Sequence, residues 1–174
     1  MEWTPNQMGA AAEAAVAWEA TKLGIPVLRP MFIDCRYDLV FELPSGLLRV
    51  QCKWAPRRKD VVLLRARTCR RIAGGYERRT YSPEEVDAIA GYCPEVDRCY
   101  VVAIDDIPPS GVMHLRLTPA KNNQLKGLHS AAEYELSHGA IAQLGERLSG
   151  RQKVAGSSPA SSTSQEPRVA RLFS

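Results

Sequence analysis

Residues 36 to 54, RYDLVFELPSGLLRVQCKW, alternate apolar and polar side chains on both sides of a Leu-Pro-Ser-Gly turn signal. Successive side chains of a β-strand point to opposite faces, so the two runs predict a β-hairpin whose strands each have an apolar face. Asp38 lies on the first strand, and Gln51 and Lys53 share the polar face of the second. A carboxylate, an amide and an ammonium group are therefore expected close together.

A helix is predicted before the hairpin, over residues 4 to 24. Thr4 fits the N-cap, with Pro5 at the first helical position and Gln7 three residues after the cap. The following stretch is rich in alanine, the best helix former. Glu13 lies among these alanines, so its carboxylate projects from a face that can pack closely against another element.

Strand and helix patterns mix along the rest of the chain. Strands are predicted over residues 25–30, 61–69, 98–105 and 112–118, and helices over residues 82–91 and from Thr118 to residue 133. This order predicts an α/β fold with a mixed central sheet flanked by helices. We expect one domain, over residues 1–138.

The composition, 45% hydrophobic and 24% charged, is that of an ordinary globular protein. None of the five cysteines forms a C-x-x-C pair, so we expect reduced thiols. The N-terminus has no signal segment, and no apolar run is long enough to cross a membrane. We therefore expect a cytoplasmic protein.

Positive charge is concentrated in residues 53 to 79. Ten Lys or Arg and two acidic residues give this segment a net charge of +8, against +4 for the whole chain. Such density favours contact with a nucleic-acid backbone; a solvated surface is the alternative. The candidate DNA-binding residues here are Arg57, Arg58, Lys59, Arg65, Arg67, Arg70, Arg71, Arg78 and Arg79.

Four side chains form a candidate catalytic site: Glu13, Asp38, Gln51 and Lys53. Oxygen ligands at this density suit a hard cation such as Mg²⁺. A lysine beside such a metal can orient a water molecule and neutralise charge on a phosphate. Taken singly, these residues are also typical of a solvated helix or of the wet face of a sheet. The combination favours a site.

This arrangement resembles the PD-(D/E)XK nuclease superfamily, in which an Asp on one strand precedes (D/E)-x-K on the next and an acidic residue lies on the first helix. Gln51-Cys52-Lys53 is similar to the Gln-x-Lys variant of homing endonucleases of the cyanobacterial group I intron type. The sequence departs from the common pattern at Tyr37, where the family has Pro, and at Gln51, where most members have a carboxylate. The other matching segments are G-A-x-A-E at 9–13, Y-D-L-V-F at 37–41, Y-S-P-E-E-V-D at 81–87, C-Y-V-V at 99–102 and L-T-P-A-K-N-N-Q at 117–124.

The resemblance implies a restriction-endonuclease-like core that cleaves double-stranded DNA with Mg²⁺, for which Mn²⁺ can substitute. Asp38, Gln51 and the Cys52 carbonyl would hold the metal, Lys53 would serve the attacking water, and Glu13 would assist from the helix. The resemblance also implies a homo-oligomer, a dimer or a tetramer. It implies phosphate contacts from Lys121, Asn122, Asn123 and Gln124.

Two other functions stay open. The missing carboxylate at Gln51 is compatible with a nucleic-acid-binding protein that has a degenerate active site. Holliday junction resolvases share the same core, so a structure-specific nuclease is the other alternative. Metal-dependent nicking would exclude the first alternative, and a preference for linear over branched DNA would exclude the second.

Residues 139 to 163 differ in character, with no sustained apolar period and an end rich in Ser, Pro and Ala. With suitable codons, AIAQLGER can encode the D-arm of a tRNA gene and GSSP its T-arm. We hypothesise that the reading frame runs through an adjacent tRNA gene. The tail, residues 139–174, is then expected to be disordered or poorly packed. A low-complexity linker is the alternative.

Overall fold

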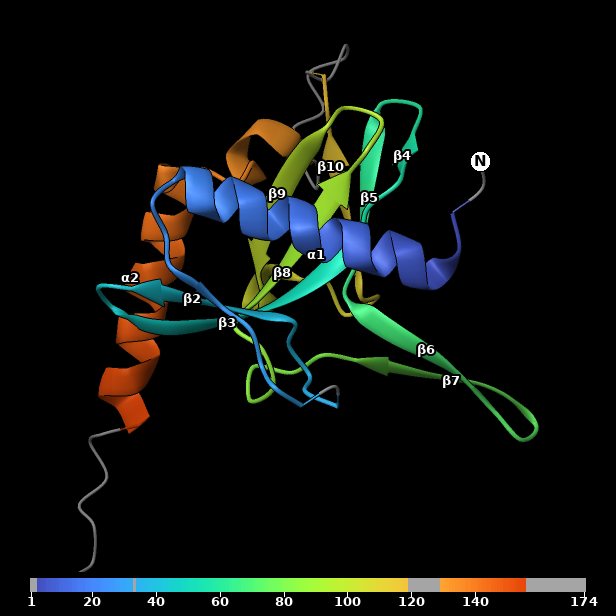
Figure 1. The fold of residues 1–174 in the computed structure, drawn as a ribbon, viewed down its shortest axis with the longest axis horizontal. Coiled ribbons are helices and arrows are strands. Elements are labelled where there is room, and N and C mark those ends of the chain that lie inside the picture. Colours follow the sequence, from blue (N-terminus) through green and yellow to red (C-terminus); the bar gives the residue numbers. More distant parts are fainter. Residues whose placement is uncertain (1–2, 33, 119–128, 156–174) are drawn as a thin grey trace, which may run out of the picture.

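A five-stranded mixed sheet contains the predicted hairpin (Figure 1). The computed structural model describes residues 3–32, 34–118 and 129–155, and of residues 69–71 and 151–155 it describes the backbone alone. The strands, in their order across the sheet, are β1 (Val27–Leu28), β2 (Leu39–Leu43), β3 (Gly46–Trp54), β8 (Ala88–Cys93) and β9 (Arg98–Ala103). β3 and β8 run parallel, whereas the other neighbours run antiparallel. The hairpin and the mixed sheet are therefore confirmed.

Helices cover one face of the main sheet, and a smaller sheet covers the other. On the first face, Val16 of α1 (Pro5–Lys22) packs in one apolar cluster with Phe41 and Val50 (Figure 1). On the opposite face, Ile89 shares a cluster with Leu64 of the smaller sheet. The strands of the smaller sheet, in order, are β11 (His129–Ser130), β10 (Val112–Arg116), β5 (Val61–Arg65) and β4 (Arg57–Arg58). The α/β class is confirmed.

α1 forms as its capping residues predict. The Thr4 side chain accepts a hydrogen bond from the Gln7 N–H at 3.3 Å, and the Gln7 side chain accepts one from the Thr4 N–H at 2.9 Å. Gly24, just after the helix, has a φ of 71°, a left-handed conformation that ends helices. Ala12 and Ala20 are fully buried, so the helix lies close to the sheet.

The predicted helix over residues 82–91 is wrong. Ser82 and Glu85 form a single turn, with the Glu85 N–H donating to the Ser82 carbonyl at 3.0 Å. The Asp87 N–H then donates to the Arg49 carbonyl at 2.9 Å, and the chain joins the main sheet as β8. Pairing beside β3 buries this apolar segment, which outweighs the local helix signal.

The predicted strand over residues 61–69 is divided into two elements. β5 ends at Arg65, the Ala66 N–H donates to the Gly111 carbonyl at 2.9 Å, and a new strand begins. Among the described residues this strand, β6 (Arg67–Ile72), pairs only with β7 (Gly75–Thr80), and the two form a ribbon that projects from the body (Figure 1). The chain therefore carries a two-stranded arm that the sequence pattern did not indicate.

The C-terminal part also differs from expectation. Of the helix predicted from Thr118 to residue 133, residues 119–128 lie outside the described residues, and the rest forms β11 and a 3₁₀ turn, η2 (Ala131–Tyr134). Another 3₁₀ turn, η1 (Ile104–Asp106), follows β9.

A second helix, α2 (His138–Ala155), occupies much of the tail that was expected to pack poorly. Ile141, Leu144 and Leu148 are buried in the apolar cluster on the α1 face of the main sheet. Their spacing of three and four residues is helical, and this signal was missed. The tRNA-gene origin of the segment stays a prediction, and residues 156–174 lie outside the described residues.

Cys35, Cys52, Cys93 and Cys99 are free thiols, as expected. Across the described ranges, no helix is long and apolar enough to cross a membrane.

Candidate active site

The hairpin register places Asp38 beside the end of β3. Asp38 directly precedes β2, and its N–H donates to the Val50 carbonyl at 3.0 Å. Its Oδ2 accepts a hydrogen bond from the Cys52 N–H at 2.8 Å and another from the Gln51 amide. The same amide nitrogen lies 3.2 Å from the Cys52 carbonyl oxygen. The carboxylate, amide and carbonyl predicted to hold a metal therefore converge.

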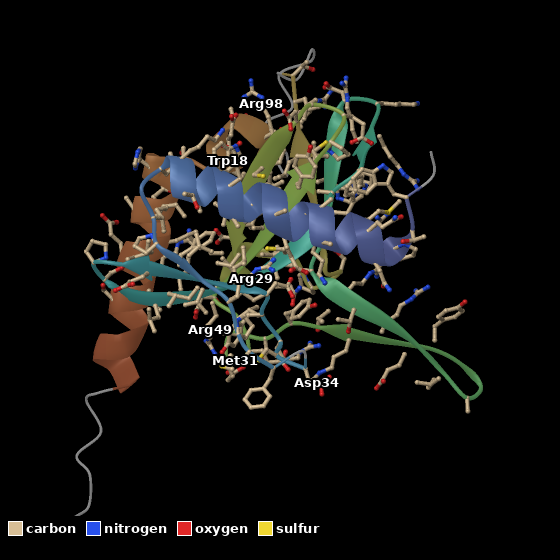
Figure 2. All side chains as sticks on the ribbon, in the orientation of Figure 1. Trp18, Arg29, Met31, Asp34, Arg49 and Arg98 are labelled. Carbon is tan, nitrogen blue, oxygen red and sulfur yellow. The ribbon has the colours of Figure 1, made fainter. Side chains whose placement is uncertain are left out.

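α1 brings a second carboxylate to this point. Burial raises the pKa of Glu13, and the nearby negative charge of Asp38 raises it further. Glu13 also forms an ion pair with Arg29, at 2.9 Å. Arg29 is labelled in Figure 2. Burial likewise raises the pKa of Asp38, although the Cys52 N–H and the Lys53 charge lower it. Both carboxylates are thus partly desolvated, and the charge of Asp38 also disfavours the charged form of Glu13. A bound cation would stabilise both charged forms.

The ammonium group of Lys53 lies at the same end of β3. Burial lowers the pKa of Lys53, and the opposite charge of Asp38 raises it again in part. Nζ donates a hydrogen bond to the Tyr81 hydroxyl at 2.8 Å. The structure therefore brings Glu13, Asp38, Gln51 and Lys53 together, as the sequence predicts.

The donor set fits a hard divalent cation. Within the described residues, no group of three or more His, Cys, Asp or Glu side chains could hold a metal ion. Binding would therefore depend on the Gln51 amide and the Cys52 carbonyl as well as on the carboxylates. These are all oxygen ligands of the kind Mg²⁺ takes beside its water molecules. The amide nitrogen of Gln51 faces the other two ligands, so metal binding requires the amide to turn and present its oxygen.

The Cys52 thiol is not part of this donor set. Side chains alternate along β3, so the thiol lies in the apolar cluster beneath α1 while Gln51 and Lys53 lie on the other face. Burial, followed by the negative charges of Asp38 and Glu13, raises the pKa of Cys52 well above its ordinary value. The thiol stays protonated, and only the backbone carbonyl is available as a ligand.

The predicted DNA-binding residues within the described ranges lie on two parts of the chain, the β4–β5 hairpin and the β6–β7 ribbon (Figure 1). Residues 57–59 lie on β4 and the turn to β5, and Arg65 ends β5. The other group lies on the β6–β7 ribbon and consists of Arg67, Arg70, Arg71, Arg78 and Arg79. The stretch 121–124 lies outside the described residues. Arg65 is at the end of β5 away from the β4–β5 turn, two residues before Arg67, and therefore lies near the base of the ribbon.

Sequence reasoning missed Tyr81 and Arg36 at this site. Arg36 lies over the Tyr81 ring, with 4.4 Å between the guanidinium carbon and the ring centroid. Arg36 also forms two hydrogen bonds to the Glu85 carboxylate, at 3.1 and 3.2 Å. The segment Y-S-P-E-E-V-D at 81–87, which includes two of these residues, was the available signal.

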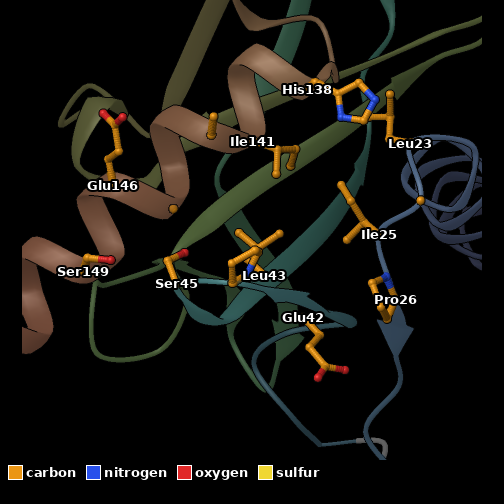
Figure 3. Close-up of a pocket in the computed structure, with 14 residues that line it drawn as sticks. Leu23, Ile25, Pro26, Glu42, Leu43, Ser45, His138, Ile141, Glu146 and Ser149 are labelled. Carbon is orange, nitrogen blue, oxygen red and sulfur yellow. The ribbon is translucent and has the colours of Figure 1, made fainter.

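A large cavity lies away from the site. It has a volume of about 760 Å³ and is formed between α2, the β2–β3 turn and the end of α1 (Figure 3). Leu43, Ile141 and Pro26 are among its lining residues, and none of the four catalytic candidates lines it. We assign the chemistry to the converging polar groups and not to this cavity.

The central mixed sheet, the helix that contributes Glu13 and the Asp38/Gln51/Lys53 hairpin define a nuclease of the restriction-endonuclease-like fold. The sequence pattern of the PD-(D/E)XK endonuclease family matches residues 3–137, and the chain belongs to this family.

A solved structure is similar to this one, that of a bacterial homing endonuclease, I-Ssp6803I. The TM-score is 0.66 at 26% sequence identity, and the match covers 83% of this chain and 97% of the other. No curated protein matches the sequence. The family and this neighbour support a nuclease.

Proposed function

We propose that the protein is a Mg²⁺-dependent DNA endonuclease similar in activity to homing endonucleases, with Mn²⁺ able to replace Mg²⁺. The observation that carries this proposal is the convergence of the Asp38 carboxylate, the Gln51 amide and the Cys52 carbonyl beside the Lys53 ammonium. Family membership and the similarity to a homing endonuclease support the reaction class.

In the proposed reaction, Asp38, Gln51 and the Cys52 carbonyl would hold the metal, and Glu13 would assist from α1. The metal, when bound, supplies positive charge to the phosphate and lowers the pKa of a bound water. Lys53 holds the attacking water and neutralises charge that develops on the phosphate oxygens. One such site cleaves one strand, so we propose that a homo-oligomer makes a double-strand cut.

Removal of the metal is expected to abolish cleavage. The full chain should nick supercoiled plasmid in Mg²⁺ or Mn²⁺. Without a bound cation, the two carboxylates of the site would repel the negatively charged phosphate. Nicking should disappear in EDTA and return when excess Mg²⁺ is added. Gel electrophoresis of the plasmid forms measures both steps. Cleavage that persists in EDTA would contradict the proposal.

A second candidate function is that of a DNA-binding protein with a degenerate active site. The observation that favours it is Gln51, where an amide replaces a charged metal ligand. No cleavage together with salt-sensitive DNA binding would support this candidate, and Gln51→Glu would be the next variant. Comparison of a four-way junction with a linear duplex of the same sequence tests the junction-specific alternative.

We further propose that the β6–β7 ribbon contacts the DNA. A two-stranded ribbon fits the major groove, and every described residue of β7 is exposed. The register pairs Arg67 with Thr80 and Cys69 with Arg78, so Arg67 and Arg78 lie on the same face. Arg79 lies on the other face and pairs with Glu85. Arg67 and Arg78 are therefore the stronger candidates for phosphate contact.

The double variant Arg67→Ala/Arg78→Ala is expected to weaken DNA binding and to flatten its salt dependence. Each lost phosphate contact lowers the slope of log K against log salt by about 1, so the pair should lower it by about 2. Fluorescence anisotropy at several salt concentrations measures the slope. Arg98→Ala/Arg147→Ala removes the same charge from ion pairs with Glu135 and Asp106, and should leave the slope nearly unchanged. Equal slopes for the two variants would exclude the ribbon as the contact.

A further inference from the structure

The ammonium group of Lys53 is held by a residue from a distant part of the chain. Tyr81 directly follows β7, and its hydroxyl oxygen lies 2.8 Å from the Lys53 Nζ. Nζ also lies 5.0 Å from the centroid of the Tyr81 ring. An ammonium group has three N–H donors and no acceptor, so the phenol oxygen takes one of the three donors and leaves two for the site.

The Tyr81 ring is itself fixed from several sides. It is 8% exposed and belongs to the apolar cluster between the two sheets. Arg36 covers the ring at 4.4 Å, and Glu85 holds Arg36 in place through two hydrogen bonds. Glu85 also accepts hydrogen bonds from the Ser82 N–H and from Arg79. The position of the hydroxyl is therefore set by Arg36, by contacts within residues 79–85 and by the apolar cluster around the ring.

The protonation state of Tyr81 suits this role. Burial raises the pKa of Tyr81 to about 12, so the phenol is neutral at physiological pH. A neutral hydroxyl can accept from the ammonium and direct its own proton elsewhere. The neutral hydroxyl therefore orients Lys53 without forming an ion pair with it. The positive charge of Lys53 stays available to a phosphate.

We propose that Tyr81 is a positioning residue for the cleavage reaction: its hydroxyl, at the base of the β6–β7 ribbon, fixes the direction in which Lys53 presents its remaining N–H groups. The inference rests on the proposed nuclease function. Lysine has a flexible four-carbon stem, and a small displacement of a catalytic group is enough to slow a reaction strongly. A fixed acceptor beside Nζ removes that freedom.

The variant Tyr81→Phe tests the proposal, because it keeps the ring against Arg36 and removes only the hydroxyl. We expect the single-turnover rate of plasmid nicking at saturating protein to fall by about 10- to 100-fold, the loss of a hydrogen bond to a charged group. DNA affinity in EDTA and the thermal midpoint should match the wild type. Tyr134→Phe is the matched control, since its hydroxyl meets His129 at 3.3 Å, and its nicking rate should not change.

A second measurement reports the contact without cleavage. Limited acetylation followed by mass spectrometry should show faster modification of Lys53 in Tyr81→Phe than in the wild type, with unchanged modification of Lys22. A nicking rate of Tyr81→Phe within twofold of the wild type would overturn the positioning role. A fall in its nicking rate that is matched by an equal fall in DNA affinity and thermal midpoint would overturn it as well. A wild-type protein that does not nick DNA would overturn the proposed function itself and this role with it, and the acetylation result would then describe a structural contact.

Discussion

Replacement of Lys53 by methionine is expected to reduce the single-turnover rate of strand cleavage by about 10²- to 10³-fold, the range for losing a group that stabilises charge developing in the transition state. Methionine keeps most of the buried stem of Lys53, so the fold should be preserved, and removes the ammonium group with its hydrogen bond to Tyr81. DNA affinity should change little, because Arg67 and Arg78 of the ribbon supply most of the proposed phosphate contact. The measurement is nicking under single-turnover conditions in Mg²⁺.

The matched control is Lys22→Met, which removes the same charge from an exposed ion pair with Glu19 at 2.7 Å, near the end of α1. This variant should cleave at the wild-type rate. If Lys53→Met also cleaves within tenfold of the wild type, Lys53 has no chemical role and the site assignment fails.

Asp38→Asn gives an independent check on the same site. Burial raises the pKa of Asp38, which means that the charged form is less favourable in the folded protein than in the unfolded chain. Its burial therefore opposes folding at pH values above the raised pKa, and this contribution decreases as the pH falls through it. The neutral amide removes the unfavourable charge, so Asp38→Asn should lose metal-dependent cleavage while its thermal midpoint is equal to or above that of the wild type.

The second large effect concerns stability. Asp87→Ala is expected to lower the free energy of unfolding by about 3 kcal/mol, the lower end of the range for breaking a buried ion pair. The Asp87 side chain is 6% exposed and accepts hydrogen bonds from the Arg49 N–H at 2.8 Å and from its guanidinium group at 3.0 Å. Its removal leaves Arg49 half-buried without its carboxylate partner, and Arg49 is part of the strand that carries Gln51 and Lys53.

Urea denaturation measures this effect as a shift of the midpoint at constant slope. Glu135→Ala is the control: Glu135 pairs with Arg98 on the surface, with side-chain exposures of 38% and 54%. An exposed pair contributes at most about 1 kcal/mol, so the control should shift the midpoint far less. Equal shifts would show that Asp87 does not anchor β3.

Much of the candidate site was predictable because its parts are local. Asp38 and Gln51 are joined by a short hairpin, and the alternation of buried side chains allows only one register for its apolar face. The capping residues at Thr4 and Gln7 likewise mark the start of α1 within four positions. The hairpin that carries Asp38 and Gln51, and the start of the helix that contains Glu13, therefore follow from neighbouring residues alone.

The contacts around Lys53 could not be predicted in the same way. Lys53 and Tyr81, which form a hydrogen bond, are separated by 28 residues in the sequence. Arg36 and Glu85 are separated by 49 residues. The helix signal at Ser82 is satisfied within one turn, but the parallel pairing of β8 with β3 then decides the conformation of the next residues. Caps and alternation are set by interactions between neighbours in the chain, whereas strand neighbours across a sheet are set by the burial of apolar surface from many segments at once. For that reason local pattern located the candidate catalytic groups, and the assembled sheet determined which side chains contact them.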